Sequence, residues 1–401
     1  MKIMFLTSEG FDTPNSINHL CETLLEDLLR SGVSVYSISS HTTGTYQDIP
    51  ASLLQYENFE YDIIHRKRID KNNFVKRYLY EIKYVFQARK LWKNKKVDGV
   101  LLQSNPNSVY HSILIKLFLK CPIVLNLYDV FPGHAMSIGV MKNKFIYAVL
   151  NFIQRILYKN CDKIVAMSED METVLLQQKI PKEKIQVIHN WFDDSVFSVI
   201  PKESNKFFQK YDLPTDVFYV QFAGLLGYVF DYRMFVDVAV LLKDNPNIRF
   251  LLIGDGNQKD AVYDYIKEKN ADNILCFPWQ PLDIIADVYS ACDIGFIPLK
   301  KGVIGNGIPS KACQLMAASR VVLNFVEESD YTKLFDAKEM GVSITSGKPQ
   351  DVADKIIELC EDPVQREYIG KNAKEYAYEY YSREKNTSLF VELIKKEVNQ
   401  K

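Results

Sequence analysis

The sequence predicts an α/β protein made of two doubly wound domains. Its 401 residues are too many for one ordinary hydrophobic core, because a single domain usually holds about 100 to 200 residues. Short apolar runs that are typical of buried strands alternate along the chain with amphipathic stretches of helical length. With 47% hydrophobic and 25% charged residues, the composition is that of an ordinary soluble globular protein.

The first domain begins with a strand, a loop and a helix. Residues 2–7 form an apolar run, residues 8–15 contain glycine and proline, and residues 17–31 carry leucines at helical spacing. Ligands of doubly wound folds bind at the carboxyl ends of the strands. Gly10 lies in such a loop and is therefore a candidate for contacting a phosphate through the backbone. The loop is no GxGxxG motif, and an ordinary strand-to-helix turn is the alternative.

A polar, proline-bearing segment marks the boundary between the domains. Residues 194–216 have few apolar positions in register, and residues 217–222 then open a new series of strands. The predicted domains are residues 1–195, residues 196–375 and a terminal helix over residues 376–401.

Three strands of the second domain end in candidate binding loops. Gly224 and Gly227 follow the strand at 217–222, and Gly254 and Asp255 follow the next strand. Trp279 follows the strand at residues 274–277.

Residues 305–316 form the most informative stretch, which predicts a loop followed by a helix. Pro309 suits the first helical position, and the N–H groups of Ser310 and Lys311 would lack intrahelical partners. The helix dipole and the charge of Lys311 would attract an anion, so a phosphate could bind here without a metal. Gln314 lies on the same helical face as Lys311. The alternative is a capped helix beside a core strand.

An apolar strand at residues 123–127 leads into a second candidate loop. Asp129 and His134 lie in this loop, together with a proline and a glycine. Such a combination directly after a strand is typical of an active-site loop. A lone loop histidine is, however, more often a surface residue.

Charge and cysteine content exclude several classes of protein. The formal net charge is −1, which disfavours a nucleic-acid partner. Seven scattered cysteines without a CxxC pair argue for a reducing compartment and against a zinc site or a disulfide framework. No apolar stretch approaches the ~20 residues of a membrane span, and no signal peptide is predicted.

The segment at residues 66–96 is strongly basic. It contains twelve lysines and arginines against Asp70 and Glu81, and aromatic residues are interleaved with them. A cationic amphipathic helix of this kind favours an anionic membrane face, which a second amphipathic helix at residues 142–159 would widen. The alternative is a solvated helix packed on its own domain.

The stretch around Lys311 also resembles a known family. The Pro-Ser-Lys run at residues 309–311, followed by Met-Ala-Ala and a valine-rich strand, resembles the donor-nucleotide motif of family 4 retaining glycosyltransferases, in the subgroup that acts on bacterial surface polysaccharides. The family usually carries two glutamates where this chain has Asn306 and Gln314. It often has a histidine where this chain has Tyr128, whereas Asp129 matches its acidic position.

This resemblance implies a GT-B fold, with two Rossmann-like domains facing across a cleft and the last helix folded back on the first domain. The implied activity is retaining transfer of a sugar from a nucleotide-sugar, with UDP favoured over GDP, to a lipid-linked oligosaccharide in capsule, O-antigen or exopolysaccharide synthesis. Lys311 would neutralise the phosphates, and the loop with Gly224 and Gly227 would approach them. Trp279 would lie near the base, and Asp129 would assist the acceptor. No metal or other cofactor is expected, and the enzyme would act in the cytoplasm at the inner membrane face.

Two alternatives remain open at this point. A UDP-sugar epimerase could share the architecture, although it needs clear acid and base residues in the cleft. A partner subunit that binds nucleotides without catalysis would explain why Tyr128, Asn306 and Gln314 depart from the family pattern.

Overall fold

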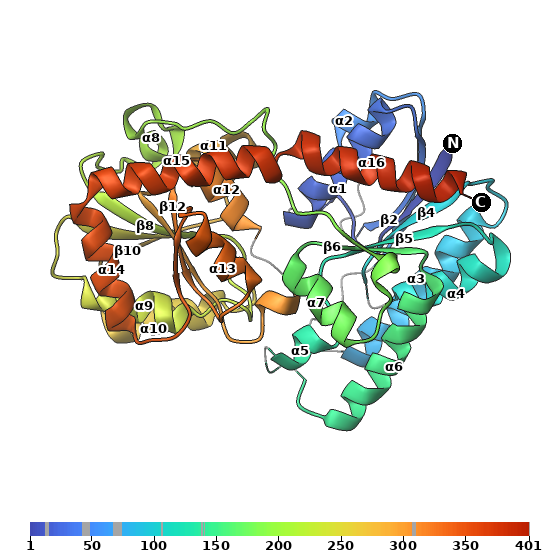
Figure 1. Ribbon diagram of the computed structural model, residues 1–401, viewed down its shortest axis with the longest axis horizontal. Helices are drawn as coiled ribbons and strands as arrows, with labels where there is room; N and C mark the ends of the chain where they lie inside the picture. The colour runs from blue at the N-terminus through green and yellow to red at the C-terminus, as the bar shows by residue number, and fades with distance from the viewer. Residues whose placement is uncertain are drawn as a thin grey trace. The chain divides into compact units, whose positions relative to one another are not determined.

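The computed structural model describes residues 1–12, 16–41, 49–66, 74–105, 107–137, 139, 141–306 and 310–400, with the backbone alone at residues 16, 74–78, 137 and 306. The chain divides into two compact units, each a parallel sheet with helices on both faces (Figure 1). The first unit comprises Met1–Met136, Met141–His189 and Glu384–Lys401, and the second is formed mainly by Asn190–Arg383.

The described residues of the first unit form a seven-stranded sheet in the order β3-β2-β1-β4-β5-β6-β7, and neighbouring strands are parallel. The strands are β1 (Lys2–Leu6), β2 (Ser34–His41), β3 (Phe59–His65), β4 (Gly99–Gln103), β5 (Ile123–Leu127), β6 (Lys163–Ala166) and β7 (Ile185–Val187). Strands β4 and β5 are buried at every position, as expected for strands covered on both faces.

Several helices of the first unit bury an apolar stripe. In α1, for example, Leu24 and Leu28 are fully buried at helical spacing. The helices are α1 (Ser16–Arg30), α2 (Ala51–Leu54), α3 (Phe74–Trp92), α4 (Ser108–Phe118), α5 (Gly133–Ser137), α6 (Lys144–Asn160), α7 (Glu169–Gln177) and α16 (Arg383–Asn399), with a 3-10 turn at η1 (Lys182–Lys184). Helix α16 packs on this unit, since Lys395 Nζ donates to the Ser31 carbonyl at 3.1 Å and Val398 lies against Gly99.

In the second unit the described residues form a six-stranded parallel sheet in the order β10-β9-β8-β11-β12-β13. The strands are β8 (Phe218–Ala223), β9 (Ile248–Ile253), β10 (Ile274–Phe277), β11 (Ile294–Pro298), β12 (Val321–Phe325) and β13 (Val342–Ile344). The strand order reverses between β8 and β11. This is the switch point at whose carboxyl edge ligands of doubly wound sheets bind.

The second unit has one hydrophobic core on each face of its sheet. One core is rich in stacked phenylalanines, such as Phe222 and Phe230 with ring centroids 3.9 Å apart, and α9, α10 and α14 cover it. The other lies under α11, α12 and α15. The helices are α8 (Lys206–Tyr211), α9 (Tyr232–Leu241), α10 (Lys259–Lys269), α11 (Ile285–Ser290), α12 (Lys311–Ala317), α13 (Asp330–Ala337), α14 (Pro349–Glu361) and α15 (Pro363–Tyr380), with 3-10 turns η2 (Lys202–Ser204), η3 (Leu282–Ile284) and η4 (Ile304–Asn306).

The prediction of an α/β protein with two Rossmann-like domains is confirmed. The structure divides between residues 189 and 190 and between residues 383 and 384, whereas the sequence predicts divisions at 195 and 375. The segment that reads as a polar linker belongs to the second unit because Phe197, Phe207 and Phe208 are buried in its core. Because polar residues flank these three aromatic residues in the sequence, the hydrophobic pattern does not indicate that they are buried.

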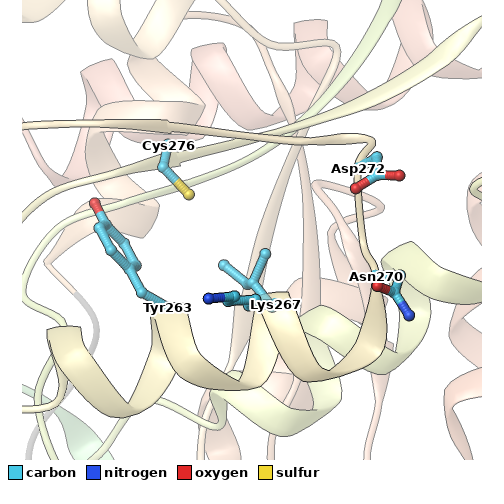
Figure 2. Close-up of a pocket in the computed structure, with 6 residues that line it drawn as sticks. Tyr263, Lys267, Asn270, Asp272 and Cys276 are labelled. Carbon is cyan, nitrogen blue, oxygen red and sulfur yellow. The ribbon is translucent and has the colours of Figure 1, made fainter.

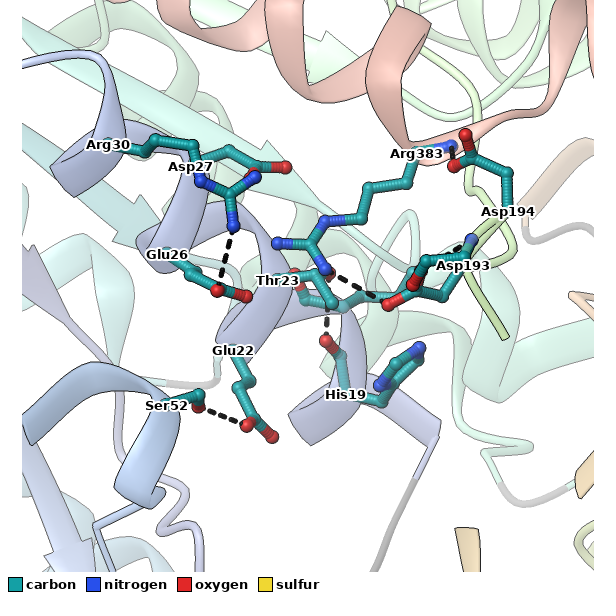
Figure 3. A network of polar contacts seen from close by, with 12 residues as sticks. His19, Glu22, Thr23, Glu26, Asp27, Arg30, Ser52, Asp193, Asp194 and Arg383 are labelled. Atoms are coloured by element: carbon teal, nitrogen blue, oxygen red, sulfur yellow. Dashed lines mark hydrogen bonds and ion pairs between the residues drawn. The ribbon is translucent and has the colours of Figure 1, made fainter. Parts of the chain in front are cut away.

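The chain crosses between the units near residues 190 and 383, and hydrogen bonds join these two segments. The Phe192 N–H donates to the Tyr381 carbonyl at 3.1 Å, and the Arg383 N–H donates back to the Phe192 carbonyl at 3.1 Å. Beside this bridge, the Arg383 guanidinium pairs with the Asp193 carboxylate at 3.0 Å (Figure 3). We refer to Phe192, Asp193, Tyr381 and Arg383 as the clasp.

Candidate functional site

Two glycines at the switch point of the second sheet allow strand-end loops to approach closely. Gly224 follows β8 and Gly254 follows β9, with φ angles of +148° and +149° that favour glycine. A Cβ on Gly254 would lie 1.9 Å from the Gly224 carbonyl oxygen. Their N–H groups donate to the carbonyls of Ile253 and Phe277, at 2.9 and 3.0 Å. These glycines therefore supply space at the predicted phosphate site, and their N–H groups are already used within the sheet.

The space beside Gly224 is filled by Lys311, the first residue of α12. A Cβ on Gly224 would lie 2.9 Å from Lys311 Cε and 3.2 Å from its Nζ. The ammonium also lies 4.2 Å from the ring centroid of Phe222 in β8, a cation–π contact. Lys311 thus extends from its helix to the carboxyl end of β8.

Lys311 carries a charge that no carboxylate of the described residues neutralises. In the described part of the chain, no acidic side chain lies within ion-pair distance of its Nζ. The side chain is only partly accessible, and burial lowers the pKa of the ammonium to about 8. An ammonium that has lost part of its hydration without gaining a counter-ion is a ready partner for a phosphate.

The structure describes the other predicted residues of this stretch to different extents. Gln314 lies one turn after Lys311 and is partly buried, and Ser310 precedes the helix. Asn306 ends η4, but its side chain lies outside the described residues, as does all of Pro309. Because α12 spans only seven residues, its dipole is short, and Lys311 itself supplies most of the positive charge.

Asp255 and Gly227 have local roles next to this site. The Asp255 carboxylate accepts the Gly256 N–H at 2.7 Å and pairs with Lys259 at 3.2 Å, which stabilises the start of α10. The Leu226 N–H donates to the Asp255 carbonyl at 2.9 Å, so the loops after β8 and β9 are joined. At Gly227 a Cβ would lie 3.2 Å from the Leu225 side chain, a tight contact.

Trp279 is presented at the end of β10 by a fixed loop. The neighbouring Gln280 is buried and donates to the Tyr211 hydroxyl at 2.9 Å and to the Pro278 carbonyl at 2.7 Å. The indole of Trp279 remains 37% exposed. An exposed aromatic ring on a rigid loop can stack with a planar group such as a nucleotide base.

In the first unit, the structure brings Asp129 and His134 together. Asp129 follows β5, and its carboxylate lies 3.9 Å from His134 Nε2. The Asp129 side chain is 56% exposed and so is accessible to a substrate. This pair is available to orient a hydroxyl group.

Tyr128, which stands where the resembled family often has a histidine, turns into the core. Its hydroxyl accepts a hydrogen bond from Asn126 Nδ2 at 3.1 Å and lies 3.8 Å from Cys21 Sγ. Burial raises the pKa of Tyr128 well above its ordinary value, so the hydroxyl stays protonated. Tyr128 therefore cannot replace the histidine as a proton acceptor.

The loop around Gly10 is held by residues that local sequence patterns do not connect. A Cβ on Gly10 would lie 2.3 Å from the Ser40 carbonyl oxygen, so only glycine fits here. Arg66 donates to the Ser8 carbonyl and pairs with Glu81 at 2.8 Å, and Asn107 also donates to Glu81, at 2.7 Å. Arg66, which the sequence groups with a basic surface segment, thus stabilises the loop after β1.

One candidate residue, Glu327, is not indicated by the sequence. Glu327, which follows β12, accepts backbone N–H groups of the segment between β11 and α12, from Gly302 at 2.6 Å and Ile304 at 3.0 Å. It is separated from both partners by more than twenty residues, so no local pattern could indicate the contact.

Comparison with known families gives the decisive observation. Residues 17–196 match the model described as Glycosyltransferase Family 4, and residues 203–376 match the model described as Glycosyl transferases group 1. The chain is a glycosyltransferase of the GT-B type. Its two matched domains correspond to the two structural units and together account for most of the chain.

Relatives and solved structures agree with this assignment. The glycosyltransferase is 25% identical over 388 residues to the "Probable glycosyltransferase WbjE" of Pseudomonas aeruginosa, covering 94% of this chain and 95% of the relative. It superposes on Anabaena Alr3699/HepE in complex with UDP-glucose with a TM-score of 0.75 at 15% identity, covering 99% and 100% of the two chains. Sucrose-phosphate synthase from Thermosynechococcus elongatus gives a TM-score of 0.81 at 15% identity over both whole chains. At such identities the structural likeness concerns the fold.

A separate hollow of this glycosyltransferase lies within the second unit. It measures about 310 Å³ and lies between α10 and the edge strand β10 (Figure 2). Tyr263, Ile266, Lys267, Asn270, Asp272 and Cys276 line it. Burial raises the pKa of the Cys276 thiol to about 11, so it is not a thiolate nucleophile at neutral pH. None of the predicted site residues lines this hollow.

Proposed function

We propose that this glycosyltransferase moves a sugar from a nucleotide-sugar, with a UDP-sugar favoured, to a lipid-linked saccharide of a bacterial surface polymer, with retention of anomeric configuration. The observation that carries the proposal is the ammonium of Lys311, which lies at the switch point of the second sheet without a carboxylate partner among the described residues. The UDP-glucose bound by HepE, which shares the fold, supports the choice of UDP.

The chemistry of transfer accounts for such a cation. The bond between the anomeric carbon and the diphosphate oxygen breaks, and negative charge develops on the departing nucleotide. Lys311 would stabilise that charge in a partly desolvated site, where electrostatic stabilisation is strongest. The described residues contain no group of three His, Cys, Asp or Glu side chains that could hold a metal ion. We propose that the cationic side chain serves instead, without a cofactor.

On the acceptor side, we assign a role to Asp129. The acceptor hydroxyl oxygen would bond to the anomeric carbon while its proton passes to the departing phosphate. Asp129 would orient that hydroxyl or stabilise the cationic sugar, and His134, 3.9 Å away, would hold the carboxylate in place. The protein then needs no further general base.

A surface of the first unit suits a lipid-linked acceptor. Helix α4 packs between α3 and α6, and the three helices gather on one side of the unit (Figure 1). Phe145 and Phe152 of α6 are 77% and 66% exposed. They are two helical turns apart and therefore lie on the same face of the helix. Further exposed apolar side chains are Leu79, Phe86, Leu117, Phe118, Ile146 and Val149. We propose that these eight residues lie together on one surface, and we call them the apolar face.

Exposed lysines and arginines lie on and next to α3 and α6. Exposed basic residues are Lys83, Lys90, Lys93, Lys96, Lys142, Lys144, Arg155 and Lys159. Glu81 is the acidic residue within α3, α4 and α6, and it is paired with Arg66. Aromatic side chains among cations are typical of a protein that rests on an anionic bilayer. Among the described helices, none is long and apolar enough to cross a bilayer. We therefore propose peripheral association with the inner face of the cell membrane.

The donor site is tested by thermal stability of the purified protein with UDP, GDP, ADP and CMP, each with and without EDTA. We expect one nucleoside diphosphate to raise the Tm in EDTA, and Lys311→Ala to abolish that rise. Lys338→Ala, which removes an exposed lysine of the same unit, is the control. An equal rise in both variants would contradict the role of Lys311. Conversion of free UDP-sugar without acceptor would favour an epimerase, and binding without turnover would favour a non-catalytic subunit.

The membrane surface is tested by sedimentation with vesicles. We expect binding to vesicles of anionic phospholipid at low salt, and little binding to zwitterionic vesicles, because both charge and apolar contact contribute. Phe145→Ser with Phe152→Ser should weaken binding at least about tenfold, since each buried phenyl ring contributes about 1.5–3 kcal/mol. Leu241→Ser, at an exposed leucine of the second unit, is the control. Unchanged sedimentation of the double variant would contradict the assigned face.

A further inference from the structure

The side chain of Lys311 lies in a space that the end of β8 leaves open. The ring centroid of Phe222 lies 4.2 Å from Nζ, and Gly224 has no side chain at the point where a Cβ would lie 2.9 Å from Lys311 Cε. Lys311 is still partly accessible to solvent. Within the part of the chain that the structure describes, its nitrogen has no hydrogen-bond acceptor and no carboxylate partner. A small molecule can therefore reach an amine that no acceptor group of these residues occupies.

Lys202 of the same unit shows the contrasting case of a paired lysine. Its nitrogen also lies near an aromatic ring, 5.3 Å from the centroid of Tyr219, and its side chain is 17% exposed. It donates to the Asp293 carboxylate at 2.7 Å and to the Val217 carbonyl at 2.8 Å. Such acceptors stabilise the ammonium form of a lysine. Lys202 is thus a matched comparison for Lys311, because the two differ chiefly in their acceptors.

An unpaired, partly desolvated lysine is a nucleophile near neutral pH. Burial lowers the pKa of Lys311 to about 8, so about a quarter of Lys311 side chains carry a free amine at pH 7.5. A lysine in water has a pKa of about 10.4 and is about 0.1% free amine at that pH. The proposed sugar transfer uses the ammonium form alone and leaves the amine form unused.

We propose that Lys311 is a modification site, which takes an acyl group from an acyl phosphate such as acetyl phosphate. This class of reagent suits the site because its phosphate is attracted to the place where the donor diphosphate binds, and its carbonyl carbon is electrophilic. The choice of reagent rests on the proposed function, since it assumes that the site attracts phosphate. The geometry of the unpaired amine does not depend on that assumption.

The transfer exchanges one bond of the acyl carbon for another. The lone pair of Nζ attacks the carbonyl carbon, an N–C bond forms, and the C–O bond to the phosphate breaks. The bonding electron pair leaves with the phosphate, which also takes the proton that the amine loses. An amide and inorganic phosphate result, without any further reactant. The ammonium form attracts the reagent and the amine form attacks it, and both are populated at neutral pH.

Acylation of Lys311 would close the donor site. An amide carries no charge, so the cation for the diphosphate and the cation–π contact with Phe222 would both be lost. The acyl group would also occupy the space beside Gly224. The supply of acyl phosphate would then set the fraction of active enzyme, and a bound nucleotide would protect that fraction.

Labelling with acetyl phosphate, followed by peptide mass spectrometry, tests the proposal. The purified full chain is incubated at pH 7.5, and initial rates are compared for Lys311, the paired Lys202 and the exposed Lys338. We expect Lys311 to react at least about tenfold faster than either, and to lose this advantage in concentrated urea, where the burial is gone. UDP at ten times its Kd should slow labelling of Lys311 about tenfold and leave Lys338 unchanged. The ester p-nitrophenyl acetate, an acetyl donor without phosphate, should show a smaller preference for Lys311.

The outcomes separate this inference from the proposed function. If UDP raises the Tm but Lys311 reacts no faster than Lys338, the modification site is wrong and the donor site stands. If Lys311 reacts fastest but UDP neither binds nor protects it, the modification site stands and the donor site is wrong. An equal preference for Lys311 with p-nitrophenyl acetate would overturn the choice of an acyl phosphate. An acylated protein whose Tm still rises with UDP would overturn the closing of the donor site.

Discussion

Lys311 combines a low pKa with a position where an anion is expected. Its ammonium is surrounded by the Phe222 ring and the Gly224 backbone, and burial lowers its pKa to about 8. The protonated form therefore prevails below pH 8 and is lost above it. A bound diphosphate would favour the protonated form, so nucleotide binding and protonation of Lys311 are linked.

This linkage predicts a pH dependence of nucleotide affinity. We expect the Kd for UDP to rise as pH increases through about 8, approaching a tenfold rise per pH unit if only the ammonium form binds. Titration calorimetry between pH 7 and 9.5 measures it. Lys311→Arg, whose guanidinium stays charged, should flatten the dependence. If the arginine variant shows the same slope as wild type, another group is responsible.

At the scale of elements, the strand-end loops of the second unit depend on glycine for close approach. Gly254 is the sharpest case, because its φ is +149° and a Cβ would meet the Gly224 carbonyl oxygen at 1.9 Å. That oxygen belongs to the backbone of the neighbouring loop and cannot turn away as a flexible side chain would. The turn after β9 therefore cannot accept a larger residue without moving the turn after β8.

Gly254→Ala should consequently destabilise the second unit by about 2 to 4 kcal/mol, through left-handed strain and the backbone clash together. Gly32→Ala is a matched control in the first unit, since Gly32 also has a positive φ but a Cβ added there would meet nothing within 4 Å. Its cost should be about 1 kcal/mol. Scanning calorimetry of both variants measures the difference. Equal costs would show that the contact with Gly224 does not matter.

Much of the fold is predictable because its signals are local. Apolar runs at residues 123–127 and 217–222 indicate strands, and the spacing of Lys311 and Gln314 places both on one helix. Contacts between distant segments leave no such signal. Glu327 reaches Gly302 across η4, α12 and β12, so nothing in its sequence neighbourhood distinguishes it from Glu328.

The same reason explains why the sequence does not indicate the contacts of Arg66 and Tyr128. The neighbours of Arg66 in the sequence group it with surface lysines, but its partner Glu81 lies fifteen residues away on α3. Tyr128 falls in a predicted active-site loop, and its contact with Cys21 on α1 turns it inward. The side chain of Asn306 and all of Pro309 lie outside the described residues, so their predicted roles stay predictions.

At the scale of the whole molecule, the clasp joins the two places where the chain passes between the units. Asp193 and Arg383 are both largely buried, and their side chains pair at 3.0 Å. Burial alone would raise the pKa of Asp193, but hydrogen bonds from Ser195 and the charge of Arg383 lower it below its ordinary value. The pair therefore stabilises the native state when Asp193 is ionised.

Asp193→Asn should lower the free energy of unfolding by about 1 to 3 kcal/mol at pH 7, because it leaves the Arg383 charge without this carboxylate. Urea denaturation measures the loss, with the exposed Asp336→Asn as control. A carboxylate with a lowered native pKa stabilises above its unfolded pKa of about 3.9 and loses that effect as pH falls through the native pKa. The difference between wild type and variant should thus shrink below pH 4. A constant difference would mean that the charge is not the cause.

The packing of α16 has a consequence for the order in which the protein is made. This helix is translated after the whole second unit, yet it covers the first unit, where Val398 meets Gly99 and Lys395 meets Ser31. While the ribosome is still producing residues 190–383, the surface of the first unit that α16 later covers stays exposed to solvent. Its sheet can form early, but its completion depends on a segment that is synthesised after the second unit, so a chain that stops before residue 384 would lose part of the first unit.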